Sequence, residues 1–169
     1  MPIFTPIGHD QLVADVLAIA AALAADDWQP TCLIGVGRGG LVPAVYLSHA
    51  SGLPTLSCDL SSNVKDFADD VLARLAARTH AGERLLFVDD INDSGRTIGL
   101  LRAALASAAP GSVRFATMLD NIASTQRVEY RSRVIDRRVT KDWFVFPWEA
   151  LGSADSLAVD AMAVPERIS

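Results

Sequence analysis

The sequence predicts an α/β fold, in which a mostly parallel five-stranded sheet is flanked by helices. Two features predict it. Short apolar runs, typical of buried strands, alternate with longer segments whose apolar residues recur at helical spacing. This alternation is the pattern of parallel sheets with helices on both faces. In addition, 50% of the 169 residues are hydrophobic, which is enough to bury a sizeable core, so we expect one domain over residues 1–169.

The expected elements follow one another in a regular order. Helical spacing is found over 9–27, over 40–52, which Gly52 ends, and over 94–111, whereas 61–82 is polar at first and then helix-like. The apolar runs that predict the five strands are 31–37, 54–60, 84–90, 112–119 and 142–148. Ligands of such sheets bind at the carboxyl ends of the strands, so the residues that follow each strand are the candidates for function.

Composition excludes several classes of function. The net charge of −5 disfavours a nucleic-acid partner, and the arginine-rich run 131–138 is interpreted as a solvated or subunit-facing strand. No apolar run reaches the roughly 18 residues that a membrane span needs. The start of the chain lacks the pattern of a signal peptide, and Cys32 and Cys58 lie in apolar runs. We therefore expect a cytoplasmic protein with reduced, buried cysteines.

A glycine motif follows the first expected strand. Gly35, Gly37 and Gly40 match the G-x-G-x-x-G fingerprint of dinucleotide-binding folds, and the acidic Asp59 lies close to the expected ~20 positions further on. The alternative is a glycine loop that binds another kind of phosphate. A second motif, downstream, decides between these two interpretations.

That second motif is "RLLFVDDINDSGRT", residues 84–97. Asp89 and Asp90 end an apolar strand, and Asp93 precedes the helix start Ser94-Gly95-Arg96-Thr97. Backbone N–H groups at a glycine-containing helix start bind anions, and the hydroxyls of Ser94 and Thr97 are further donors. The two adjacent carboxylates suit sugar hydroxyls or a divalent cation instead. Together these groups fit a ribose 5-phosphate.

The stretch "FVDDINDSGRT" resembles the signature of type I phosphoribosyltransferases, whose substrate is 5-phosphoribosyl-1-pyrophosphate (PRPP). The resemblance implies a core over about 28–150 and a small hood made by the terminal segments. It also implies that Arg38-Gly39-Gly40 hold the pyrophosphate of PRPP. The dinucleotide interpretation is disfavoured, because it leaves residues 89–97 unexplained.

Two further stretches, "GRGGLVPA" and "DWFVFPWE", resemble the bacterial and archaeal xanthine–guanine branch of the purine enzymes. This resemblance implies that Trp143 covers one face of a purine, while main-chain groups of Phe144 read its edge. The cofactor it implies is magnesium (Mg2+).

The resemblance also assigns roles to the acidic residues. Asp93 is implied as the general acid/base, Asp89 and Asp90 as ligands of ribose and magnesium, and Glu149 as a weaker metal ligand. Residues 61–82 are expected to form a mobile loop in which Lys65 is the base able to reach pyrophosphate. A homodimer or homotetramer is expected by analogy with the family.

The chain departs from this branch at one position. Where the branch has a lysine that contacts the 6-oxo group, the matching stretch "RFATMLDNIAS" has Asn121, whose amide can donate to a carbonyl but carries no charge. Three functions therefore stay open. They are transfer to a 6-oxopurine, transfer to another base, and a regulator that binds a purine nucleotide such as guanosine tetraphosphate.

Overall fold

The computed structural model describes residues 3–59 and 65–162, apart from the side chains of residues 65–68 and 160. No helix within these ranges is long and apolar enough to cross a membrane. The elements in chain order are β1 (Phe4–Pro6), α1 (His9–Ala24), β2 (Cys32–Val36), α2 (Gly37–Ser51), β3 (Thr55–Cys58), α3 (Lys65–Thr79), β4 (Leu85–Asn92), α4 (Arg96–Ala104), β5 (Val113–Asn121), β6 (Tyr130–Ile135), β7 (Trp143–Val145), the 3-10 helix η2 (Glu149–Leu151) and α5 (Ala154–Met162).

The main sheet has five parallel strands in the order β3-β2-β4-β5-β6, which confirms the predicted fold class. From β2 the chain passes to β3 on one side and returns to β4 on the other. The strand order therefore reverses between β2 and β4. In open parallel sheets, such a reversal leaves a crevice at the carboxyl ends of the two strands, where ligands bind.

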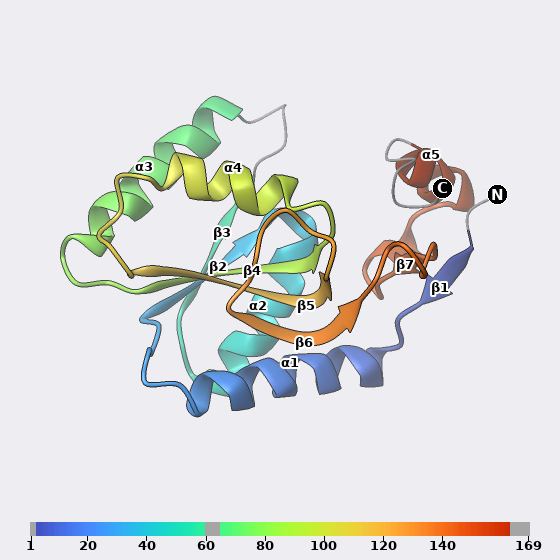
Figure 1. The fold of residues 1–169 in the computed structure, drawn as a ribbon, viewed down its shortest axis with the longest axis horizontal. Coiled ribbons are helices and arrows are strands. Elements are labelled where there is room, and N and C mark those ends of the chain that lie inside the picture. The colour runs from blue at the N-terminus through green and yellow to red at the C-terminus, as the bar shows by residue number, and fades with distance from the viewer. Residues whose placement is uncertain (1–2, 60–64, 163–169) are drawn as a thin grey trace.

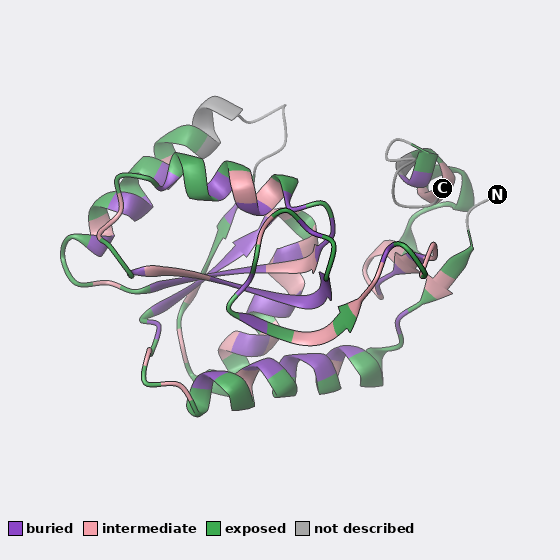
Figure 2. Cartoon of the chain, in the orientation of Figure 1, coloured by how far each residue is buried: buried purple, intermediate pink, exposed green. Residues whose placement is uncertain are grey.

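Helices cover both faces of this sheet (Figure 1). Because successive residues of a strand point to opposite faces, neighbours separate into two cores. Leu86 packs with residues of α1 and α2, whereas the adjacent Phe87 packs with residues of α3 and α4. The central strands are accordingly buried along most of their length (Figure 2), as expected for a sheet covered on both sides.

A hood of β1, β7, η2 and α5 lies beside the carboxyl ends of the main strands (Figure 1). In it, β1 and β7 form a separate two-stranded parallel sheet in which Phe4 pairs with Trp143. The backbone N–H of Trp143 donates to the carbonyl of Ile3 at 2.7 Å. The hood thus joins the beginning of the chain to the segment after β6.

Two expectations about the elements need correction. The apolar run 142–148 is not a strand of the main sheet: its strand, β7, pairs with β1, and the fifth strand is β6, inside the arginine-rich stretch. As an edge strand, β6 is only partly covered: Arg131 is exposed, and Ser132 and Arg133 are half-buried, which is why its sequence reads as solvated.

The second correction concerns residues 61–82, expected to be a mobile loop. Positions 60–64 lie outside the described residues, as does the side chain of Lys65. From Lys65 to Thr79 the chain is a helix, and Leu72 and Leu75 are buried in the core beneath it. This part of the range is therefore a packed core element.

Candidate active site

The predicted site residues lie on neighbouring segments at the point where the strand order reverses. The first turn of α2 follows β2, the acidic pair ends β4, and the segment 93–97 leads from β4 into α4. Asn121 ends β5, and Trp143, Phe144 and Glu149 lie in the hood. The fold therefore brings four separate stretches of sequence, 38–40, 89–97, 121 and 143–149, to one edge of the sheet.

The glycine motif forms the first turn of α2 rather than a loop. Gly39 and Gly40 are required by close packing against β4. A Cβ atom on Gly39 would overlap the carboxylate of Asp90, and one on Gly40 would overlap the carbonyl oxygen of Val88. The free N–H groups of a helix start favour an anion at this place. Arg38, which is exposed, lies on the same turn.

The acidic pair lies opposite this turn. Asp89 accepts a hydrogen bond from the backbone N–H of Asp90 at 3.0 Å, and Asp90 accepts one from the N–H of Ile91 at 2.7 Å. Both carboxylates are half-buried. The carboxylate of Asp90 lies against Gly39 of this turn and lines both cavities beside the hood, whereas Asp89 precedes it on the same strand.

The segment from Asp93 to Gly95 makes a tight turn before α4. Gly95 has a φ of +88°, and a Cβ there would lie 2.6 Å from Thr125 Oγ1. The hydroxyl of Thr125 donates to the carbonyl of Ser94 at 2.8 Å. Since Ser94 and Arg96 are exposed and Thr97 is half-buried, the outer side of this turn is open to a ligand.

A network of three buried side chains, Asn92, Asp120 and Ser124, which the sequence analysis missed, holds the strand ends together. Asn92 donates to the carboxylate of Asp120 at 2.8 Å and accepts from the hydroxyl of Ser124 at 3.0 Å. This network ties the end of β4 to the end of β5. No local signal distinguishes Asn92 from an ordinary polar residue of a loop.

Arg137 is the main residue that sequence reasoning missed. It is only 7% exposed, and its guanidinium pairs with the carboxylate of Asp93, which is 4% exposed. Nε–H lies 3.1 Å from each Asp93 carboxylate oxygen, and Nη2–H donates to Oδ2 at 2.9 Å. Its neighbour Arg138 instead pairs with Asp136 near the surface. In the sequence both arginines belong to the run 131–138, and nothing in that run indicates which of them is buried.

The amide of Asn121 is engaged with the protein itself. Nδ2 donates to the backbone carbonyl of Asp93 at 3.0 Å, and Oδ1 accepts from the backbone N–H groups of Ala123 and Arg137 at 3.1 and 3.2 Å. Asn121 thereby fixes the turn that carries Asp93 and the start of the segment that carries Arg137. That it contacts a base stays a prediction.

Below the hood lies a cavity of about 80 Å³. Its lining residues are Asp90, Ile91, Arg137, Trp143, Phe144, Phe146 and Glu149. The Arg137 guanidinium stands 5.3 Å from the ring centre of Phe144. The cavity thus has aromatic walls, one cation, and two carboxylates at its border.

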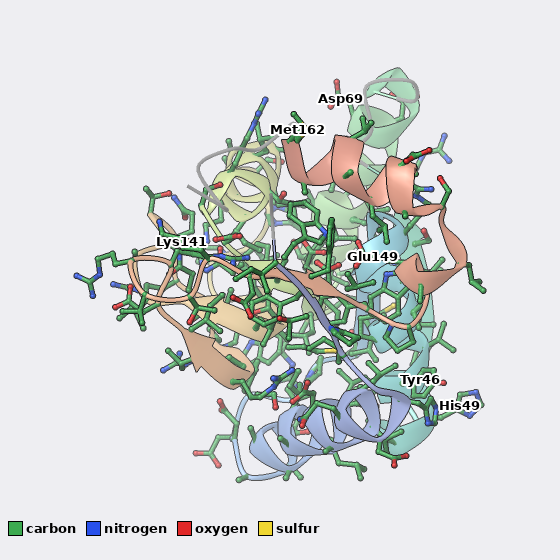
Figure 3. The ribbon with its side chains drawn as sticks, turned by 90° about the vertical axis from the view of Figure 1, so that its right-hand side faces the viewer. Tyr46, His49, Asp69, Lys141, Glu149 and Met162 are labelled. Carbon is green, nitrogen blue, oxygen red and sulfur yellow. The ribbon has the colours of Figure 1, made fainter. Side chains whose placement is uncertain are left out.

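A larger cavity of about 730 Å³ borders the first one. Arg38 and Gly39 line it on the α2 side, while Glu149 and Leu157 line it on the hood side, and Asp90 and Glu149 belong to both cavities. Figure 3, which views the hood side, shows Glu149 between α5 and α2. The two cavities together give space for an aromatic ring at one end and a polyanion at the other.

The carboxylates at the junction of the cavities fit magnesium. Asp90 and Glu149 offer oxygen ligands there, and Asp89 precedes Asp90 on β4. Within the described residues, no group of three His, Cys, Asp or Glu side chains forms a metal cluster. Magnesium does not need one, because it keeps several waters and takes its remaining ligands from a substrate's phosphates.

Comparisons with known proteins agree with this fold. A family model described as "Phosphoribosyl transferase domain" matches residues 8–151. A purine phosphoribosyltransferase from Pyrococcus horikoshii is 24% identical, with a TM-score of 0.64 over 86% of this chain and 94% of that one. A hypothetical protein from Neisseria gonorrhoeae with bound ppGpp is 20% identical, with a TM-score of 0.68 over 96% and 98%. A xanthine-guanine-hypoxanthine phosphoribosyltransferase from Helicobacter pylori is 18% identical, with a TM-score of 0.64 over 94% and 99%.

Proposed function

The chain belongs to the phosphoribosyltransferase family, as its sequence signature predicted, and from this premise we propose that it transfers ribose 5-phosphate from PRPP to a 6-oxopurine. Guanine, xanthine or hypoxanthine would be the acceptor and pyrophosphate the leaving group, which places the enzyme in purine salvage. One observation carries the proposal. The acidic pair and the phosphate-type turn of residues 89–97 meet the glycine turn of α2 beside an aromatic cavity.

The substrate is assigned along this edge by chemical complementarity. The turn Ser94–Thr97 at the start of α4 would bind the 5′-phosphate of PRPP, since helix starts favour anions. The first turn of α2, with Arg38, Gly39 and Gly40, would bind the pyrophosphate. Asp89 and Asp90 lie between the two turns, where the ribose hydroxyls would be placed.

Magnesium, held by Asp89, Asp90 and Glu149, would supply positive charge against the leaving pyrophosphate. In the reaction, a purine nitrogen forms a bond to C1 of the ribose as the bond from C1 to the pyrophosphate oxygen breaks. The protein's share is to hold both ends of PRPP and to stabilise the charge that develops on pyrophosphate through Arg38 and the amides of α2. Asp93 would take the proton that the purine nitrogen loses.

The base would lie in the smaller cavity. Trp143 and Phe144, on β7, offer it an aromatic surface and main-chain groups. We extend the proposal to a cytoplasmic homodimer or homotetramer. Consistent with a reducing compartment, Cys32 and Cys58 are both free thiols in the described structure.

A second candidate function is regulatory. The protein from Neisseria gonorrhoeae carries ppGpp on the same fold, and a chain with Asn121 in place of the expected lysine fits a nucleotide binder with little turnover. Transfer to a base other than a 6-oxopurine is a third. The regulator would consume neither PRPP nor a base, whereas transfer to another base would consume PRPP together with that base.

The deciding experiment is pyrophosphate release from magnesium–PRPP with guanine, xanthine, hypoxanthine, adenine and uracil in turn. We expect release with a 6-oxopurine, and a loss of about 10²–10⁴-fold in kcat for Asp93→Asn. Asp27→Asn, at an exposed position before β2, is the matched control and should keep full activity. Saturable binding of ppGpp without release from any base would refute transfer and support the regulator.

A further inference from the structure

The side chain that faces the base cavity is Arg137, and not the carboxylate with which it pairs. Arg137 lines the cavity together with Trp143 and Phe144, whereas Asp93 and Asn121 are absent from its lining. Both of these are buried behind it, 4% exposed each. A base that entered the cavity would therefore meet a guanidinium first.

The guanidinium is fixed in orientation by its own hydrogen bonds. Nε–H and one Nη2–H are used by Asp93, and the two Nη1–H groups donate to the carbonyls of Thr140 and Asp142 at 3.3 and 2.5 Å. A guanidinium has five N–H groups. The remaining one, on Nη2, has no acceptor among the residues that the structure describes.

From this arrangement we propose that Arg137 selects the base, accepting rings that present an oxygen at position 6 and rejecting those that present an amino group. The proposal rests on the proposed function, which assigns this cavity to the base. Arginine donates and never accepts, so a carbonyl oxygen pairs with the open Nη2–H, while an amino group sets two donors against each other. Asn121 need not take over the role of the lysine found in the related enzymes, because the guanidinium of Arg137 already faces the cavity.

In this arrangement Asp93 acts as a positioning residue, and the proton transfer proposed above would need its carboxylate to turn from Arg137 toward the cavity. Its carboxylate holds the guanidinium at Nε and Nη2, which leaves the open N–H directed away from it. A lysine at 137 would keep the charge but lose this two-point geometry. The pair as a whole therefore defines where the base oxygen lies.

Binding of inosine and adenosine monophosphates tests the selection without requiring turnover, because the two nucleotides differ at position 6. We expect the wild-type protein to bind inosine monophosphate about 10-fold or more tightly than adenosine monophosphate, the usual effect of a buried donor left without an acceptor. Calorimetric titration of both nucleotides in magnesium buffer measures the ratio.

Removing Arg137 alone would leave the buried Asp93 carboxylate without its guanidinium, so the variants are built as a matched pair. Asp93→Asn keeps Arg137, and Asp93→Asn/Arg137→Met removes both charges. The preference for inosine monophosphate should weaken but remain in the single variant, because the amide oxygen of Asn can still accept from the guanidinium at one point. It should fall to within about 3-fold in the double variant. Circular dichroism checks that both variants are folded.

The outcomes separate this proposal from the proposed function. A preference that survives in the double variant, or that is missing in the wild type, overturns the assignment of Arg137. Absence of pyrophosphate release together with an intact preference overturns transfer and leaves the selection standing. A wild-type protein that binds neither nucleotide overturns both.

Discussion

Replacing Gly95 by alanine is the sharpest test of the turn that we assign to the 5′-phosphate. Gly95 has a φ of +88°, and its α-hydrogens face the loop that follows β5. An added Cβ would lie 2.6 Å from Thr125 Oγ1 and 2.8 Å from both Ser124 Oγ and the backbone nitrogen of Gln126. Two penalties therefore act at the same position.

The magnitudes follow from these two penalties. A left-handed backbone costs an alanine roughly 1–2 kcal/mol, and overpacking costs about 1–3 kcal/mol more. Gly95→Ala should thus lower the free energy of unfolding by about 2–5 kcal/mol. The matched control is Gly99→Ala, inside the helix α4 that this turn precedes, where the nearest atom to an added Cβ is 3.6 Å away. Since alanine is the better helix former, this variant should gain about 0.5–1 kcal/mol.

Urea unfolding followed by circular dichroism measures both free energies, and the KM for PRPP measures the turn itself. We expect Gly95→Ala to raise KM, because the displaced turn presents its N–H groups in a different direction, while Gly99→Ala leaves KM unchanged. Equal stability and equal KM in the two variants would refute the assignment of the turn.

Three further predictions concern charge and burial. Arg38→Ala should raise the KM for PRPP about 10-fold or more, since a hydrogen bond to a charged group contributes about 1.5–3 kcal/mol. Arg84→Ala is the control, because Arg84 is exposed at the opposite end of β4, and it should leave the KM unchanged. Similar KM values in the two variants would exclude Arg38 from the pyrophosphate site. Burial, reinforced by a neighbouring carboxylate, raises the pKa of Cys58 to about 11. At pH 8 neither Cys58 nor the buried Cys32 should therefore react with Ellman's reagent until the protein is unfolded. Rapid labelling of the native protein would contradict this prediction. Backbone and side-chain donors hold the pKa of Asp26 below its ordinary value of 3.8. Asp26→Asn should therefore melt at a lower temperature than the wild type at pH 7, and this difference in melting temperature should close as the pH falls below 3.8. A difference that does not depend on pH would exclude the ionised form as its source.

Much of the fold was predictable because its signals are local. Continuous apolar runs and helical spacing are properties of single segments, and the parallel sheet follows from their alternation. The partner of a strand is not a local property. For this reason Trp143–Val145 read as a fifth core strand, although its hydrogen bonds go to β1.

The same distinction applies to the site. Residues 89–97 form one contiguous motif, so their position at a strand end was visible in the sequence. Arg137 lies 44 positions from Asp93, and its burial depends on that pairing and on the carbonyls of the following loop. In the sequence it is one of several arginines around an edge strand, and only the three-dimensional structure distinguishes it.

The pairing of β1 with β7 has a consequence for how the proposed base preference would be inherited. Trp143, on the wall of the cavity that we assign to the base, is held by the strand Phe4–Pro6 from the other end of the chain. A chimera that exchanges only the segment after β6 would pair the β7 of one parent with the β1 of the other. Recombination between relatives should therefore transfer base preference intact only when both strands come from the same parent.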